Sequence, residues 1–88
     1  MESVTGVADA PRPDRQLTFG EKAVGLTFNP GGNPLVNAIK ESSAKYIDML
    51  NELRDSNSNP EIKRQLSIAI TEAQTSQMWA VKAVTWQY

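Results

Sequence analysis

Two Asn-Pro dipeptides divide this chain into helices. In Asn33-Pro34 and again in Asn59-Pro60, a side chain that caps helices precedes a residue suited to the first helical position. The six residues Arg54–Asn59, RDSNSN, do not favour a continuing helix, and a connection of this length joins antiparallel neighbours. The sequence therefore predicts an all-α fold, an antiparallel two-helix hairpin preceded by an extended N-terminal arm.

The first predicted helix carries an apolar stripe at intervals of three and four residues. Lys40 and Ser42 lie off this stripe and are candidates for function. Ser43 lies on the stripe. Its small hydroxyl side chain could leave room for a ligand or another segment to approach, or it could simply donate a hydrogen bond to the preceding helical turn. The stripe consists of Val36, Ile39, Ser43, Tyr46, Leu50 and Leu53, with Ile47 beside it.

The second predicted helix, from about Pro60 to Thr85, has two apolar faces. One consists mainly of small side chains, whereas the other contains Ile70, Met78 and Val81 with Trp79 and Trp86 nearby. The tryptophans share a face and could stack on a nucleobase or pack against another segment. Because one partner helix cannot cover both faces, we expect a homo-oligomer.

Upstream of the hairpin, residues 1–16 combine prolines, small residues and scattered charges without an apolar period, and this predicts a disordered or loosely attached arm. Residues 17–88 form the predicted domain. Val24, Leu26 and Phe28 alternate with polar or small residues, which predicts a short extended segment lying on a helix. The turn Asn29-Pro30-Gly31-Gly32 follows.

This turn brings different chemical groups to one helix entrance. Thr27 and Phe28 come just before it, Asn29 is its first residue, and Lys40 and Ser42 follow about two turns into the helix. An aromatic ring, an amide, hydroxyls and an ammonium group could bind a small polar ligand with a flat ring. The same groups could instead hold the N-terminal arm on the helix.

A second candidate surface lies on the second helix. Arg64 and Thr71 are two turns apart, with Ser67 and Ile68 between them on the same face. A guanidinium, hydroxyls and an apolar side chain could receive a phosphate and a base. The alternative is a surface arginine paired with an acid such as Glu61.

Composition excludes several classes of function. The 88 residues contain no Cys and no His, which removes thiol and imidazole catalysis and Cys/His zinc sites, so we expect no enzyme and no cofactor. Nine basic residues against ten acidic ones argue against a protein that coats DNA or RNA. No apolar run could span a membrane and no secretory signal is visible, so we expect a cytoplasmic protein.

Two stretches resemble a known family. The segments Thr27–Lys40, TFNPGGNPLVNAIK, and Ile68–Trp86, IAITEAQTSQMWAVKAVTW, are similar to the phage anti-defence sponges that include the anti-CBASS and Thoeris anti-defence hairpin proteins. The resemblance covers roughly Phe19 to Trp86 and is a whole-domain pattern rather than a catalytic signature.

This resemblance implies a helical hairpin that assembles into dimers and then hexamers and binds cyclic nucleotide immune signals in the host cytoplasm without cleaving them. It implies stacking of a base on Phe28, contacts from Lys40 and Ser42 to phosphate, and a second, trinucleotide-type pocket lined by Arg64 and Thr71. Cyclic dinucleotides, cyclic trinucleotides and cyclic ADP-ribose isomers are the expected partners. From the residues alone, the competing hypothesis is a small helical oligomer that binds another protein through its tryptophan face.

Overall fold

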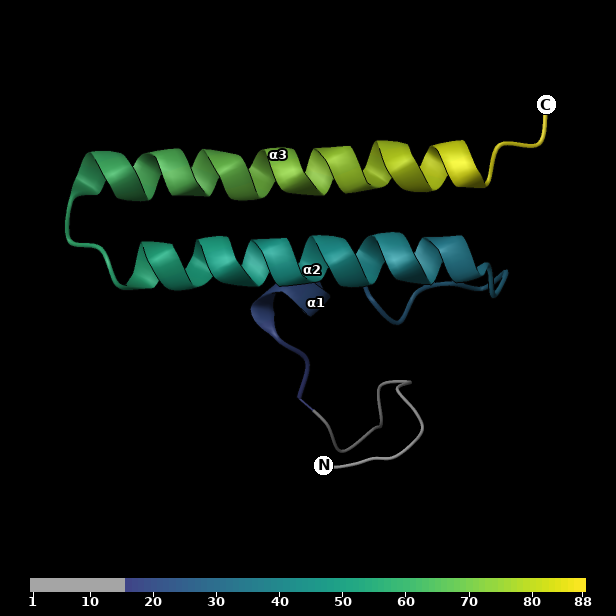
Figure 1. Cartoon of the computed structure of the whole chain (residues 1–88), viewed down its shortest axis with the longest axis horizontal. Coiled ribbons are helices and arrows are strands. Elements are labelled where there is room, and N and C mark those ends of the chain that lie inside the picture. Colours follow the sequence, from purple (N-terminus) through teal and green to yellow (C-terminus); the bar gives the residue numbers. More distant parts are fainter. Residues whose placement is uncertain (1–15) are drawn as a thin grey trace.

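The computed structural model describes residues 16–88, and these form a helical hairpin with one short additional helix (Figure 1). The helices are α1 (Phe19–Val24), α2 (Pro34–Asp55) and α3 (Pro60–Val84). α2 and α3 run antiparallel along their whole length, while α1 lies against α2. The predicted all-α hairpin is confirmed for this part of the chain. The predicted arm, residues 1–16, lies outside the described residues except for Gln16.

Both long helices begin where the Asn-Pro dipeptides predict. The side-chain oxygen of Asn33 accepts the N–H of Leu35 at 2.8 Å, and that of Asn59 accepts the N–H of Glu61 at 2.9 Å. These caps satisfy amides that have no partner inside the helix. The prediction that the helix stops before Arg54 is wrong, because α2 continues to Asp55 and Arg54 bonds to the side chains of Asn51 and Ser67.

The predicted extended segment beginning at Val24 is wrong at that residue, which is the last residue of helix α1. Thr18 and Glu21 form a capping box at the start of α1, in which each side chain accepts the backbone N–H of the other. Gly25 ends the helix in the left-handed conformation, with φ of 63°. The capping box and the terminating glycine are both visible in the sequence. They outweigh the alternation of Val24, Leu26 and Phe28, which has no second strand in the described chain to pair with.

The core lies where α1, α2 and α3 meet, and Ile47 at its centre is completely buried. The core face of α2 is rotated from the predicted stripe, so that Tyr46 and Leu53 are about half exposed. The prediction that Lys40 lies off the apolar stripe is therefore wrong in its consequence, because Lys40 lies on the buried face of α2 with 6% of its surface exposed. The core cluster consists of Val24, Ala44, Ile47, Leu50 and Ile70, with Leu66, Ala69 and Ala73 packed against it.

Many large apolar side chains of the described chain remain exposed. They lie on all three helices and on the segments between and after them, so one hairpin covers only a small core. None of the helices in residues 16–88 has the length and apolarity that crossing a bilayer requires. The exposed side chains are Phe19, Phe28, Leu35, Tyr46, Met49, Leu53, Ile62, Ile68, Met78, Trp79, Trp86 and Tyr88.

Candidate functional site

A cavity of about 230 Å³ opens where the turn before α2 meets the last turns of α3. It brings together three residues predicted from the sequence, Phe28, Asn29 and Lys40. Phe28 is 71% exposed, which leaves its side chain accessible to a flat partner. The remaining lining residues are Pro30, Gly31, Asn33, Val36, Val81 and Thr85.

Lys40 holds the chain segment that carries Phe28. Its Nζ donates to the carbonyl oxygen of Gly25 at 3.0 Å and to that of Phe28 at 2.5 Å. The same Nζ lies 5.5 Å from the centroid of the Phe28 ring, within the range of a cation–π interaction. The ammonium group is therefore engaged with its own chain on two sides and with the ring.

Hydrogen bonds from two asparagine side chains hold the turn that lines the rest of the cavity. The amide nitrogen of Asn29 donates to the carbonyl oxygen of Asn33 at 2.9 Å and to the side-chain oxygen of Asn37 at 3.0 Å. The amide nitrogen of Asn33 reaches the carbonyl oxygen of Val84 at 3.4 Å. These bonds tie the turn to the start of α2 and, more weakly, to the end of α3.

Two predicted residues, Thr27 and Ser42, are exposed and are not among those that line this cavity. Conversely, the sequence predictions missed Val81 and Thr85 on α3. The helix lengths could have predicted them. In an antiparallel hairpin, helices of 22 and 25 residues place the end of the second beside the start of the first.

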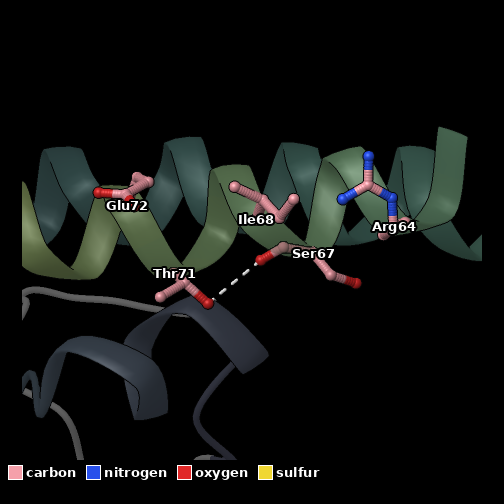
Figure 2. Close-up of a pocket in the computed structure, with 5 residues that line it drawn as sticks. All are labelled: Arg64, Ser67, Ile68, Thr71 and Glu72. Carbon is pink, nitrogen blue, oxygen red and sulfur yellow. Dashed lines mark hydrogen bonds between the residues drawn. The ribbon is translucent and has the colours of Figure 1, made fainter. Parts of the chain in front are cut away.

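A shallow groove of about 340 Å³ runs along the outer face of α3 (Figure 2). Its lining includes Arg64, Ser67, Ile68 and Thr71, which the sequence places on one face, together with Glu72. The hydroxyl of Thr71 donates to the carbonyl oxygen of Ser67 at 3.2 Å, so its own oxygen can still accept a hydrogen bond. The predicted arrangement is therefore present on the surface of a single chain.

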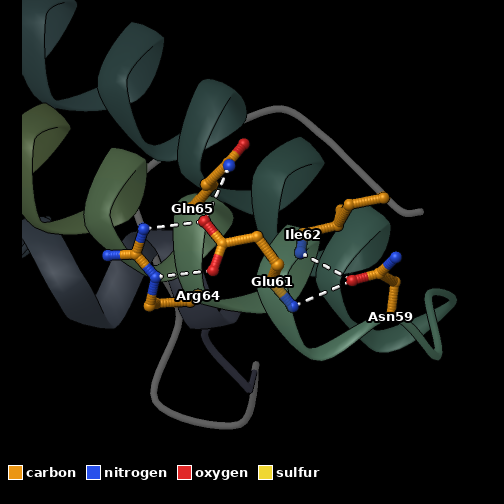
Figure 3. Close-up of polar contacts among 5 residues, drawn as sticks. All are labelled: Asn59, Glu61, Ile62, Arg64 and Gln65. Atoms are coloured by element: carbon orange, nitrogen blue, oxygen red, sulfur yellow. Dashed lines mark hydrogen bonds and ion pairs between the residues drawn. The ribbon is translucent and has the colours of Figure 1, made fainter.

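Arg64 also forms the surface ion pair that was the alternative interpretation (Figure 3). Its Nε and one terminal nitrogen donate to the two carboxylate oxygens of Glu61 at 2.9 and 2.7 Å. The bonds from Arg64 are the main cause that lowers the pKa of Glu61, and a bond from Gln65 is a smaller one. The carboxylate of Glu61 in turn raises the pKa of Arg64. Because both side chains are well exposed, an anion could compete for the guanidinium.

A third surface gathers aromatic rings around Lys82. Its Nζ lies 4.9 Å from the ring centroid of Trp79 and 5.9 Å from that of Trp86, which confirms that the tryptophans share a face. The Trp86 and Tyr88 rings meet edge to face with centroids 5.2 Å apart. A pocket of about 320 Å³ lies beside them, lined by Thr75, Met78, Trp79 and Lys82.

The fold is a small helical hairpin in which an aromatic ring and a cation lie together beside the start of α2. Residues 21–85 match the family described as Acb2/Tad1, hairpin domain. The chain belongs to this family, the anti-CBASS and Thoeris anti-defence sponges of phages, which are binding proteins rather than enzymes. No curated protein and no solved structure matches the chain significantly.

Proposed function

We propose that this protein sequesters cyclic nucleotide immune signals in the cytoplasm of the host bacterium without cleaving them, and so blocks activation of CBASS or Thoeris effectors. The ligands would be cyclic dinucleotides, cyclic trinucleotides or cyclic ADP-ribose isomers. The observation that carries this proposal is the Phe28 cavity, in which an exposed ring lies beside a cation and an amide. Bases, phosphates and ribose hydroxyls call for these three kinds of group.

The division of the binding residues follows the two hollows. Phe28, Asn29 and Lys40, with the exposed Thr27 and Ser42 nearby in sequence, would serve dinucleotide-type ligands. Arg64 and Thr71 would serve trinucleotide-type ligands in the groove on α3. Arg64 would release its exposed ion pair with Glu61 and bind a phosphate instead. Breaking this pair would cost little free energy, because exposed ion pairs contribute little stability.

We further propose that residues 17–88 form the binding domain and assemble into dimers and then a hexamer. The exposed apolar side chains on α2 and α3 support this assembly. Both hollows are open in one chain, so a second subunit would enclose a ligand and strengthen every polar contact to it. Enclosure by preformed surfaces also limits the ordering cost of binding.

One experiment tests sequestration directly. The purified protein is mixed with a cyclic dinucleotide, a cyclic trinucleotide or a cyclic ADP-ribose, and native mass spectrometry counts subunits and bound ligands. Heat then releases the ligand for chromatography. We expect the cyclic compound to return unaltered, whereas recovery of a linear or hydrolysed product contradicts the proposal.

A second function is supported by the aromatic surface around Lys82. Met78, Trp79 and Trp86 are strongly exposed, and such side chains are enriched where proteins bind one another. A helical oligomer that binds a protein partner would use this surface. Thermal shift against the same cyclic nucleotides separates the two functions, because a ligand that binds the folded state raises the melting temperature and a partner-only module shows no rise.

A further inference from the structure

We infer that Arg54 is a positioning residue, which orients the hydroxyl of Ser67 so that it donates a hydrogen bond to a phosphate oxygen in the groove on α3. Arg54 itself is not among the residues that line this groove or the Phe28 cavity. Ser67 would join Arg64 and Thr71 as a residue that contacts the ligand. The inference rests on the proposed function for the identity of that ligand, a cyclic trinucleotide.

Arg54 lies near the end of α2, where side chains from all three helices hold its guanidinium group. One terminal nitrogen donates to Oδ1 of Asn51 at 2.8 Å, and the guanidinium carbon lies 5.6 Å from the centroid of the Phe19 ring on α1. The other terminal nitrogen donates to Oγ of Ser67 on α3 at 3.0 Å. Because the guanidinium is planar and half-buried, these contacts fix the nitrogen that faces Ser67.

The bond from Arg54 determines how the Ser67 hydroxyl can be used. A guanidinium only donates, so Ser67 accepts from it and keeps its own O–H for another acceptor. The hydroxyls of Thr71 and Thr75 on the same helix donate to the carbonyl oxygen four residues earlier. Ser67 forms no such bond within residues 16–88, and its oxygen is instead held toward α2. The hydroxyl hydrogen is therefore directed away from Arg54.

Ser67 lies where a phosphate would need a donor. It lines the groove between Arg64 and Thr71, about one helical turn from each (Figure 2). Phosphate oxygens only accept hydrogen bonds, and a hydroxyl that donates to one forms a short, charge-assisted bond. A hydroxyl oriented before the ligand arrives also lowers the ordering cost of binding. Arg54 thus acts on the groove from behind, through the oxygen of Ser67.

Ser67→Ala tests the contact with the ligand, because alanine removes the hydroxyl and favours the helix. Calorimetry should show binding of cyclic tri-AMP weakened about tenfold and binding of cyclic di-AMP, the ligand type assigned to the Phe28 cavity, unchanged. If Ser67 serves only as an acceptor for Arg54, both affinities stay at the wild-type value, and this result overturns the inference. Equal losses for both ligands overturn it as well, because they indicate a general disturbance of the fold.

Arg54→Met tests the positioning, because methionine keeps an apolar stem and removes every donor. Binding of cyclic tri-AMP should weaken about three- to tenfold in the wild-type background and less than about twofold in Ser67→Ala. Losses that multiply in full mean that Arg54 acts through its charge, which overturns the positioning role. Lys45→Met, which removes an exposed positive charge from the same helix, is the control and should leave both affinities unchanged.

Asn51→Ala covers the case in which Arg54→Met does not fold. This variant keeps the charge of Arg54 and removes the bond that fixes its guanidinium, so binding of cyclic tri-AMP should weaken about two- to fivefold. Wild-type affinity in Asn51→Ala overturns the positioning role. A wild-type protein that binds cyclic di-AMP but not cyclic tri-AMP overturns the whole inference, whereas one that binds no cyclic nucleotide overturns the proposed function instead.

Discussion

Gly20 lies so close to α2 that a Cβ atom on it would stand 2.1 Å from the carbonyl oxygen of Ala44. Its N–H donates to a carboxylate oxygen of Asp48 at 2.7 Å, which fixes α1 against the middle of α2. α1 leads directly into the turn that carries Phe28. The close approach at Gly20 therefore contributes to the position of the candidate site.

Gly20→Ala should displace α1 and destabilise the protein by about 1–3 kcal/mol, as overpacking against a backbone atom does. Thermal unfolding followed by circular dichroism measures this. Gly31→Ala is the matched control, because a Cβ on Gly31 meets no atom within 4 Å and should leave the melting temperature nearly unchanged. An unchanged melting temperature in Gly20→Ala would contradict the packing described for α1.

Phe28→Ala should weaken binding of a cyclic dinucleotide by roughly ten- to a hundredfold, because stacking of one base contributes about 1–3 kcal/mol. Calorimetry measures the loss, and Phe28→Tyr, which keeps the ring, should bind as the wild type does. The side chain is largely exposed, so the stability of Phe28→Ala should change little. A Phe28→Ala variant with wild-type affinity would show that the ring is not part of the site.

Arg64→Gln should weaken binding of a cyclic trinucleotide and leave binding of a cyclic dinucleotide unchanged, because Arg64 lines the groove on α3 and not the Phe28 cavity. Phe28→Ala should show the opposite pattern. The two titrations are done on the same preparations by calorimetry. Equal losses for both ligands in both variants would mean that one site, not two, binds them.

Arg64→Gln should also raise the pKa of Glu61 toward its ordinary value, since the bond from Arg64 is the main cause of the lowering. A carboxylate whose pKa is lowered by folding stabilises the protein above its unfolded-state pKa, and this contribution is lost as the pH falls through the folded-state pKa. The acid limb of the stability profile should therefore flatten in the variant. NMR titration of the Glu61 carboxyl carbon measures the pKa, with Lys63→Gln as a control for the lost charge.

Asn33→Ala should cost about 1 kcal/mol of stability, because the N–H of Leu35 loses its cap. Asn33→Asp keeps the accepting oxygen and adds a negative charge near the helix start, so it should be about as stable as the wild type. Denaturant unfolding distinguishes the two. A loss in Asn33→Asp equal to that in Asn33→Ala would mean that the bond from Asn33 to Val84, rather than the cap, is what stabilises the structure.

The sequence predicts the hairpin well because its determinants are local. Asn33-Pro34 and Asn59-Pro60 specify the helix starts through bonds that span two or three residues. The signal for α1 is equally local, because Thr18 and Glu21 form a capping box. The alternation of Val24, Leu26 and Phe28 predicted an extended segment that overlaps the end of this helix at Val24.

The candidate site is less predictable because its contacts join distant parts of the chain. Lys40 reads as a polar residue off the apolar stripe, yet the carbonyl oxygens of Gly25 and Phe28 make its burial possible. No pattern around residue 40 reveals that a turn more than ten residues earlier will supply two acceptors. Similarly, Val81 and Thr85 join the cavity through the return of α3, not through their own sequence context.

The position of Val81 and Thr85 has a consequence for how the protein is made. A chain that has left the ribosome only as far as α2 already contains Phe28 and Lys40, but it has no far wall for the cavity. That wall is added when the last turns of α3 fold back beside the start of α2. A translation product interrupted after α2 would therefore possess the ring and the cation but not the part of the lining that Val81 and Thr85 supply.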